Sequence, residues 1–435
     1  MSARSARARA LLVVGLGVGL LVLSVAALLP PATSTPATVA GGSTSTLDRR
    51  ISAAQARLAR QEQDPRTWAE LGAAYVEKAR ITANPAYYPK AEGALRKSLA
   101  QQPDGNGPAL TGMGALANAR HDFAAARSFG EQAREVLPDT AEVYGVLTDA
   151  YTQLGDTEAA TAALQRMLEL KPGVSSFTRA AYEFELHGNV DDARHALDRA
   201  LADAIDPADI AFCRYRLGEL AFDNGDIDAA GRHYEAGLLV VPEDPPLLQG
   251  RAKVAAARGH TEEALAGYRD LVSRLPNTQY PQEYALLLTF AGEPENAERQ
   301  YALIEQQEQL QAASGATDDL AASLVAADRG DAGQALERAQ AEWSRRQPVF
   351  VADALAWALH LSGRDVEALT YADHAAGTGW RNATFFYHRG MILAGLGRDA
   401  EAVTALTEAL RINPHFSPVE ARTARATLAN LRGAG

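Results

Sequence analysis

Apolar residues in the stretch 141–174 recur at helical spacing in two successive runs. The apolar positions of the two runs are Tyr144, Leu147 and Tyr151, then Ala160, Leu164 and Met167. The large residues of the first run recur with i, i+3 and i+7 spacing, and those of the second with i, i+4 and i+7 spacing. Each spacing places its side chains on one face of an α-helix, so the stretch predicts two short amphipathic helices.

The residues that separate and follow these runs are typical of helix ends. Gly155 can adopt the left-handed conformation that closes the first helix, and Asp156 can cap the amino end of the second. Pro172 cannot continue the second helix and turns the chain. The stretch therefore predicts a helix–turn–helix hairpin.

The same pattern recurs along most of the chain, and we find ten copies of it from Pro65 onward. Counting Ala141 as position 1, position 20 is alanine in every copy and position 8 is always small. Position 20 holds Ala91, Ala126, Ala160, Ala193, Ala230, Ala264, Ala297, Ala335, Ala368 and Ala402, and position 8 holds Gly72, Gly114, Thr148, Ala181, Gly218, Ala252, Ala285, Ser323, Ala356 and Gly390. Small side chains here let the two helices of a hairpin cross closely, so a larger residue at Ala160 is expected to overpack the crossing. Ala163 is expected on the outer face, where a larger residue would be tolerated.

These columns resemble the tetratricopeptide repeat, a helix–turn–helix unit of about 34 residues with large, small, Ala and Pro residues at fixed positions. The resemblance covers residues 65–416 and implies an all-α, right-handed superhelical solenoid of about ten repeats. It also implies that the first helix of each repeat lines a concave groove in which a ligand binds. We expect capping helices over 49–64 and 417–435, and longer linkers at 203–209 and 306–318.

The first residues of the chain have the character of an export or membrane-anchoring signal. Arg4, Arg7 and Arg9 precede an uncharged run at 10–29, which is long enough to span a hydrocarbon core of roughly 30 Å. By the positive-inside rule, a single-pass transmembrane helix here would leave the rest of the chain outside the cytoplasm. We expect the helix to remain as an anchor in the cytoplasmic membrane; the alternative is signal cleavage, which would release a secreted soluble protein. Residues 30–48 are rich in Pro, Ser and Thr and predict a disordered linker.

The net charge argues against nucleic acid as a partner. The chain of 435 residues carries 54 acidic and 42 basic residues, a formal net charge of −12. A large electropositive surface for phosphate backbones is therefore not expected. Few of the basic residues are lysine, and this usage is similar to that of proteins from GC-rich bacteria such as actinobacteria.

No sequence motif for catalysis or cofactor binding is found. The chain lacks a Gly-x-x-x-x-Gly-Lys-Ser/Thr phosphate loop, a Gly-x-Ser-x-Gly nucleophile turn and a His-Glu-x-x-His zinc helix. We therefore expect no enzymatic activity and no cofactor. The single cysteine, Cys213, is expected to be a packed apolar side chain. His360 and His388 fall on first helices of adjacent copies and could meet near Asp353, so a metal- or small-molecule-binding carrier, or an enzyme that uses the groove, stays an alternative.

Aromatic residues gather at positions of the pattern that would face the groove. Together with a neighbouring His and Met, they are Tyr182, Tyr215, Phe222, Phe290, Phe350, Trp357, His360, Tyr387 and Met391. By the resemblance, this surface implies a scaffold for a protein or an extended apolar peptide, with a partner expected in the cell envelope and the aromatic rings as anchors. The alternative is that part of the set packs between neighbouring repeats. The Lys and Asn pairs with which related chaperone-binding repeats hold acidic peptide tails are absent from the ten copies.

Overall fold

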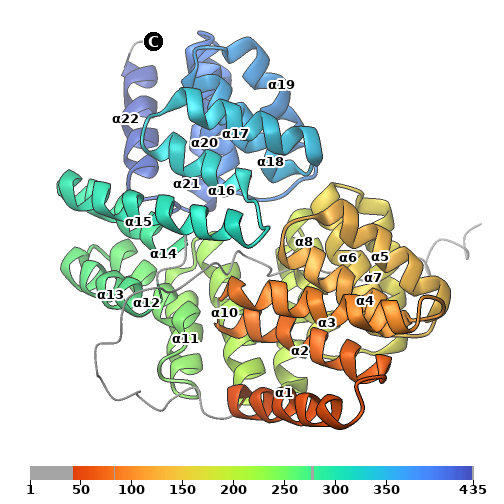
Figure 1. Ribbon diagram of the computed structural model, residues 1–435. Helices are drawn as coiled ribbons and strands as arrows, with labels where there is room; N and C mark the ends of the chain where they lie inside the picture. The colour runs from red at the N-terminus through yellow and green to blue at the C-terminus, as the bar shows by residue number, and fades with distance from the viewer. Residues whose placement is uncertain (1–42, 83, 276–278, 434–435) are drawn as a thin grey trace, which may run out of the picture.

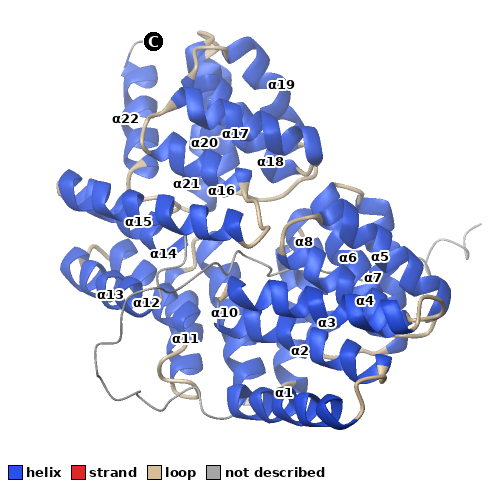
Figure 2. Cartoon of the chain, in the orientation of Figure 1, coloured by secondary structure: helices blue, strands red, loops and turns tan. Residues whose placement is uncertain are grey.

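The structure is a computed structural model that describes residues 43–82, 84–275 and 279–433. In these ranges the chain is all-helical, with twenty-two α-helices, one short 3-10 helix and no β-strand (Figures 1 and 2). The all-α fold class is therefore confirmed for the described residues. None of the described helices is both long enough and apolar enough to cross a membrane. The predicted transmembrane segment at 10–29 lies outside the described residues, as does most of the predicted linker at 30–48.

The helices follow one another with short connections. Their bounds are α1 (Ser43–Arg60), α2 (Pro65–Thr82), α3 (Tyr88–Gln101), α4 (Gly107–Ala119), α5 (Phe123–Val136), α6 (Ala141–Leu154), α7 (Thr157–Leu170), α8 (Val174–Leu186), α9 (Val190–Asp203), α10 (Pro207–Asp223), α11 (Ile227–Leu238), α12 (Pro245–Ala257), α13 (Thr261–Arg274), α14 (Gln279–Ala291), α15 (Pro294–Ala313), α16 (Asp319–Asp328), α17 (Ala332–Arg345), α18 (Val349–Leu361), α19 (Asp365–Ala376), α20 (Ala383–Gly395), α21 (Asp399–Ile412) and α22 (Glu420–Gly433). The 3-10 helix, Pro85–Tyr87, lies between α2 and α3.

Helices α2 to α21 pair in chain order into ten hairpins within the described residues, and each hairpin packs against the next. These hairpins correspond to the ten copies found in the sequence. Helix α1 covers the first hairpin by burying Leu47, Ile51 and Leu58 against residues that include Leu71 of α2. It begins at Ser43, inside the region predicted as a linker, because Leu47 extends the apolar face that packs on α2.

The two small-residue columns lie where the helices of each hairpin cross. Every alanine at position 20 is at most 3% exposed, and every residue at position 8 is buried. A Cβ atom added to Gly72 would lie 2.5 Å from a side-chain carbon of Leu95, so this crossing has no room for a larger residue. The predicted crossing is therefore confirmed. The expectation for Ala163 is wrong: it is 7% exposed and packs in the same cluster as Ala160, because the second helix also contacts the following hairpin.

The segment 306–318, predicted as a linker, is mostly helical. Helix α15 has 20 residues, and its buried face continues as far as Gln311. The extra residues of this copy therefore lengthen its second helix. The predicted linker at 203–209 is likewise shortened to a brief loop, because α10 begins at Pro207, a residue well suited to the first turn of a helix.

The first half of the superhelix contacts the second half through turns and loops, and Figure 1 shows α16 and α18 on the side of the second half that is turned to α8. Turns inside hairpins of the first half, together with Phe222 near the end of α10, meet the loops before α16, α18 and α20 and the end of α21. The contacting pairs are His121 with Asp318, Gly155 with Gln347, Gly188 with Gly379, Gly225 with Ile412, and Phe222 with Asn413. We call these contacts the seam.

Arg346 joins the two sides of the seam. Its side chain is buried, and Nη1 donates a hydrogen bond of 2.6 Å to Oε1 of Gln153. Its guanidinium carbon lies 4.8 Å from the ring centroid of Phe123 on one side and 5.2 Å from that of Phe350 on the other. Cation–π and hydrogen-bond contacts therefore hold two distant parts of the chain together.

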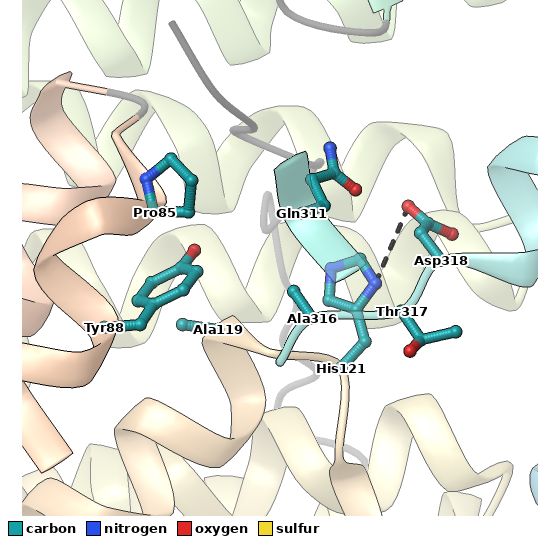
Figure 3. Close-up of a pocket in the computed structure, with 8 residues that line it drawn as sticks. All are labelled: Pro85, Tyr88, Ala119, His121, Gln311, Ala316, Thr317 and Asp318. Carbon is teal, nitrogen blue, oxygen red and sulfur yellow. Dashed lines mark ion pairs between the residues drawn. The ribbon is translucent and has the colours of Figure 1, made fainter. Parts of the chain in front are cut away.

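The seam also explains an unusual residue in the second hairpin. Eight hairpin turns have glycine with a φ angle between 69° and 85°, and His121 takes the same place in the second hairpin with a φ of 61°. Its Nδ1 atom lies 3.6 Å from Oδ2 of Asp318. Figure 3 shows both side chains at a cavity of about 20 Å³, which Tyr88 and Gln311 also line. The ion-pair contact accompanies a left-handed conformation that is uncommon for a non-glycine residue.

Candidate binding surface on the inner wall

The first helices of the hairpins form the inner wall of the superhelix. Neighbouring first helices contact one another directly, for example α10 with α12 and α18 with α20. We call the space that this wall faces the lumen. Arg422 of α22 reaches the ring of Phe290 on α14, with 5.0 Å between the guanidinium carbon and the ring centroid.

The nine predicted groove residues do not form one open surface. Phe222 and Tyr387 are only 5% and 3% exposed and belong to the packed core, whereas Phe290 is 36% exposed. The remaining members are partly exposed and are Tyr182, Tyr215, Phe350, Trp357, His360 and Met391. The set is therefore divided between core and open wall, and its role in binding stays a prediction.

The structure brings three of these residues together on α18 and α20. The ring of Trp357 stacks on His360 at a centroid distance of 5.0 Å and lies 5.5 Å from the ring of Tyr387. It also stacks at 4.2 Å on His388, the candidate metal ligand. The expected grouping of Trp357 with Tyr387 and His360 is thus present, although Tyr387 is buried.

Basic side chains of the chain itself cover several aromatic rings of the wall. The pairs, with the distance from the cationic group to the ring centroid, are Lys253 and Phe222 at 4.4 Å, Arg422 and Phe290 at 5.0 Å, and Arg346 and Phe350 at 5.2 Å. An aromatic face attracts a cation through its negative quadrupole. Rings that the sequence suggested as anchors for an apolar peptide therefore already contact cations.

Ion pairs link consecutive first helices along the wall. The pairs are Asp149 with Arg179 at 2.6 Å, Glu185 with Arg216 at 2.8 Å, and Glu219 with Lys253 at 2.9 Å. Each of these side chains is at most 22% exposed, so the pairs are largely removed from water. Sequence analysis missed them. Opposite charges at groove positions of successive copies could have predicted these ion pairs. The position of each charged residue within the repeat, however, differs from pair to pair.

Two carboxylates beside these pairs lack a basic partner. Within the described residues, Asp223 and Glu283 form no ion pair. Lys253 lies near both of them and near Glu219. Burial alone would lower the pKa of Lys253, but these three charges outweigh burial and raise that pKa. Asp223 touches solvent, yet the protein around the lumen removes part of its hydration and raises its pKa to about 7, with Glu219 adding to the rise.

Neutral donors hold Glu283. The Nε2 atom of Gln249 donates to its two carboxylate oxygens at 2.7 and 2.8 Å, and the hydroxyl of Tyr268 donates at 2.8 Å. Gln249 is only 1% exposed, and its Oε1 has no hydrogen-bond donor among the described residues. We give the name acidic cluster to Glu219, Asp223, Gln249, Lys253 and Glu283.

A second polar group lies at the carboxyl end of the solenoid. His388 is 2% exposed, with Nδ1 2.9 Å from Oδ2 of Asp353 on α18 and Nε2 3.4 Å from Oε1 of Glu420 on α22. Burial alone would lower the pKa of His388, but the two carboxylates outweigh burial and raise it to about 10. The side chain is therefore a buried imidazolium that joins three helices.

The predicted meeting of His360 and His388 near Asp353 forms only in part. His388 contacts Asp353, whereas His360 pairs with Asp365 at 2.5 Å. No group of three or more His, Cys, Asp or Glu side chains in the described part of the chain could hold a metal ion. Cys213 is buried, as expected, and burial raises the pKa of its thiol to about 12.

Comparison with known proteins identifies the repeat. Residues 141–173 and 383–416 match the family model described as tetratricopeptide repeat. No curated protein matches the chain.

Similar solved structures have low sequence identity. A tetratricopeptide repeat protein from Parabacteroides merdae has a TM-score of 0.36 and 16% identity, over 60% of this chain and 98% of that one. The human IFIT1 dimer with m7Gppp-AAAA has a TM-score of 0.47 and 16% identity, over 77% of each chain. Yeast Tom70 has a TM-score of 0.37 and 14% identity, over 90% of this chain and 87% of that one. The two segments that match the tetratricopeptide repeat model form the hairpins α6–α7 and α20–α21, and the other described hairpins share their form and their two small-residue columns.

Proposed function

We propose that this protein is a non-enzymatic scaffold that binds an extended segment of a partner protein along its inner wall. The observation that carries the proposal is that the wall keeps both an aromatic ring and a carboxylate open to solvent. Phe290 is 36% exposed on α14, and Asp223 is exposed on α10. A partly exposed aromatic ring among ordered polar groups suits a protein contact better than a packing role.

Site-specific photo-crosslinking tests this proposal. A photoreactive phenylalanine analogue in place of Phe290 is expected to give discrete adducts with a partner protein. The same analogue at Val366, which is 76% exposed on the second helix α19, is the matched control and should give none. Adducts of equal yield from both positions, or only from position 366, would place the contact elsewhere than in the lumen.

We also propose that residues 10–29 hold the protein in the cytoplasmic membrane of a bacterium, with the solenoid and its partner in the cell envelope. Arg4, Arg7 and Arg9, which precede the uncharged run, support this orientation. A reporter enzyme that is active only outside the cytoplasm, fused after Gly435, should be active and remain with the membranes. Activity in the soluble fraction would favour the secreted alternative, and an inactive reporter would exclude export.

A further inference from the structure

We propose that the acidic cluster binds a lysine or arginine side chain of the partner segment, so that the partner is a basic extended peptide. This inference rests on the proposed function, because it assumes that the inner wall receives a partner. It replaces the apolar peptide expected from the sequence with one of opposite charge to the cluster.

This part of the wall carries more acidic than basic side chains. Glu185 and Glu219 are neutralised by Arg216 and Lys253, at 2.8 and 2.9 Å. Asp223 and Glu283 lie beside these pairs without an ion-pair partner in the described residues. Four carboxyl groups thus share two bases, so a ligand cation would complement the charge of this part of the wall.

The amide of Gln249 has a buried oxygen that lacks a donor. Its NH₂ group is turned to Glu283, which leaves Oε1 without a donor in a side chain that is 1% exposed. A buried acceptor without a donor costs free energy, and such groups call for an explanation. An ammonium or guanidinium group supplies several donors and no acceptor. A cation that reaches Oε1 of Gln249 would supply the donor that this oxygen lacks.

The aromatic rings beside the cluster favour an organic cation. Lys253 lies 4.4 Å from the ring centroid of Phe222 while it pairs with Glu219, so this wall already holds an ammonium group between a carboxylate and an aromatic face. The ring of Tyr215 is partly exposed on the same helix. Aromatic faces favour organic cations, because these lose less hydration than compact metal ions on binding.

The source of the cation follows from the arrangement of the cluster along the wall. Its residues lie on the neighbouring first helices α10, α12 and α14, so an extended chain can follow them. Such a chain can place one basic side chain at the acidic cluster while its backbone runs along neighbouring first helices. We therefore assign the cation to a peptide side chain.

The test measures binding of a fluorescent peptide of alternating glycine and lysine to the full-length protein by anisotropy. A peptide of alternating glycine and glutamate is the charge-reversed probe and should not bind. Asp223→Asn and Glu283→Gln should each weaken binding of the lysine peptide by at least about tenfold. Asp191→Asn removes the same charge from the outer helix α9, where the side chain is 81% exposed, and should leave binding unchanged. Unaltered melting temperatures would show that the variants fold.

Several results would overturn the inference. Equal weakening by Asp191→Asn and Asp223→Asn would mean general attraction to an acidic chain, and no binding of the lysine peptide would exclude a cation site. Displacement of the peptide by equal concentrations of cadaverine or of calcium chloride would assign the cluster to a free diamine or a metal ion. If the lysine peptide does not bind while position 290 still crosslinks to a partner, the proposed scaffold function is retained and only the proposal of a basic partner is wrong.

Discussion

Replacing His388 with alanine is expected to lower the free energy of unfolding by about 3 to 5 kcal/mol. The imidazolium is 2% exposed and lies between Asp353, itself 4% exposed, and Glu420. Its removal leaves the Asp353 carboxylate buried without a cation, and it also removes the ring that stacks on Trp357 at 4.2 Å. Urea denaturation followed by circular dichroism measures the loss. Hydrogen exchange should place it mainly in α18 to α22, because repeat proteins lose stability most in neighbouring repeats.

The contribution of His388 should also depend on pH in a defined direction. The pKa of His388 is raised to about 10 in the folded protein, against an ordinary value of about 6.5 for an unfolded chain. Below the unfolded value both states are protonated, so the contribution is fully present. It is lost as the pH rises from the unfolded value through about 10, because only the folded state then holds the proton.

The control for both measurements is His260→Ala. The side chain of His260 is 62% exposed at the start of α13, so its removal should change stability little at any pH. If His388→Ala and His260→Ala have the same effect, or if the difference between wild type and His388→Ala is constant from pH 6 to about 10, the imidazolium does not hold the carboxyl end together.

Replacing Gly188 with alanine is expected to open the seam and to lower the free energy of unfolding by about 2 to 5 kcal/mol. Two effects contribute to this loss. The φ angle of Gly188 is +73°, a left-handed conformation that costs a residue with a Cβ atom about 1 to 2 kcal/mol. The added Cβ atom would also clash with the carbonyl oxygen of Gly379, and overpacking of this kind costs about 1 to 3 kcal/mol. Because the clash is with backbone rather than with a flexible side chain, the two sides of the seam must separate to relieve it.

Gly259→Ala separates these two effects. Gly259 has a φ angle of +79°, and a Cβ atom added there would have no neighbour within 4 Å. The control should therefore show only the conformational cost. Small-angle scattering should report a larger radius of gyration for Gly188→Ala than for Gly259→Ala, with faster proteolysis in the loop that contains Gly379. Identical scattering and equal stability of the two variants would show that the seam does not close the superhelix in solution.

The aromatic residues of the inner wall were only partly predictable from the sequence. The positions of Tyr215, Phe222 and Phe290 on first helices followed from the repeat pattern, because the pattern specifies which face of each helix is turned inward. Their exposure did not follow from it. Phe222 is 5% exposed and Phe290 is 36% exposed although both occupy groove positions, because burial there depends on how neighbouring hairpins are rotated.

Sequence analysis by itself determined the features that depend on contacts inside one hairpin. The alanine at position 20 and the small residue at position 8 occur in every copy, and a glycine lies between them in eight hairpin turns. Each acts within a repeat of about 34 residues, so the local pattern is enough to predict it. The tertiary structure decided the contacts between distant hairpins, which depend on the sum of many small rotations between successive hairpins. Asn413 donates to the carbonyl of Phe222, a residue 191 positions away, and nothing in the local pattern of either residue specifies that contact. The rotation from one hairpin to the next is set by side-chain packing along the whole solenoid, and only its accumulated value brings the two halves together at the seam.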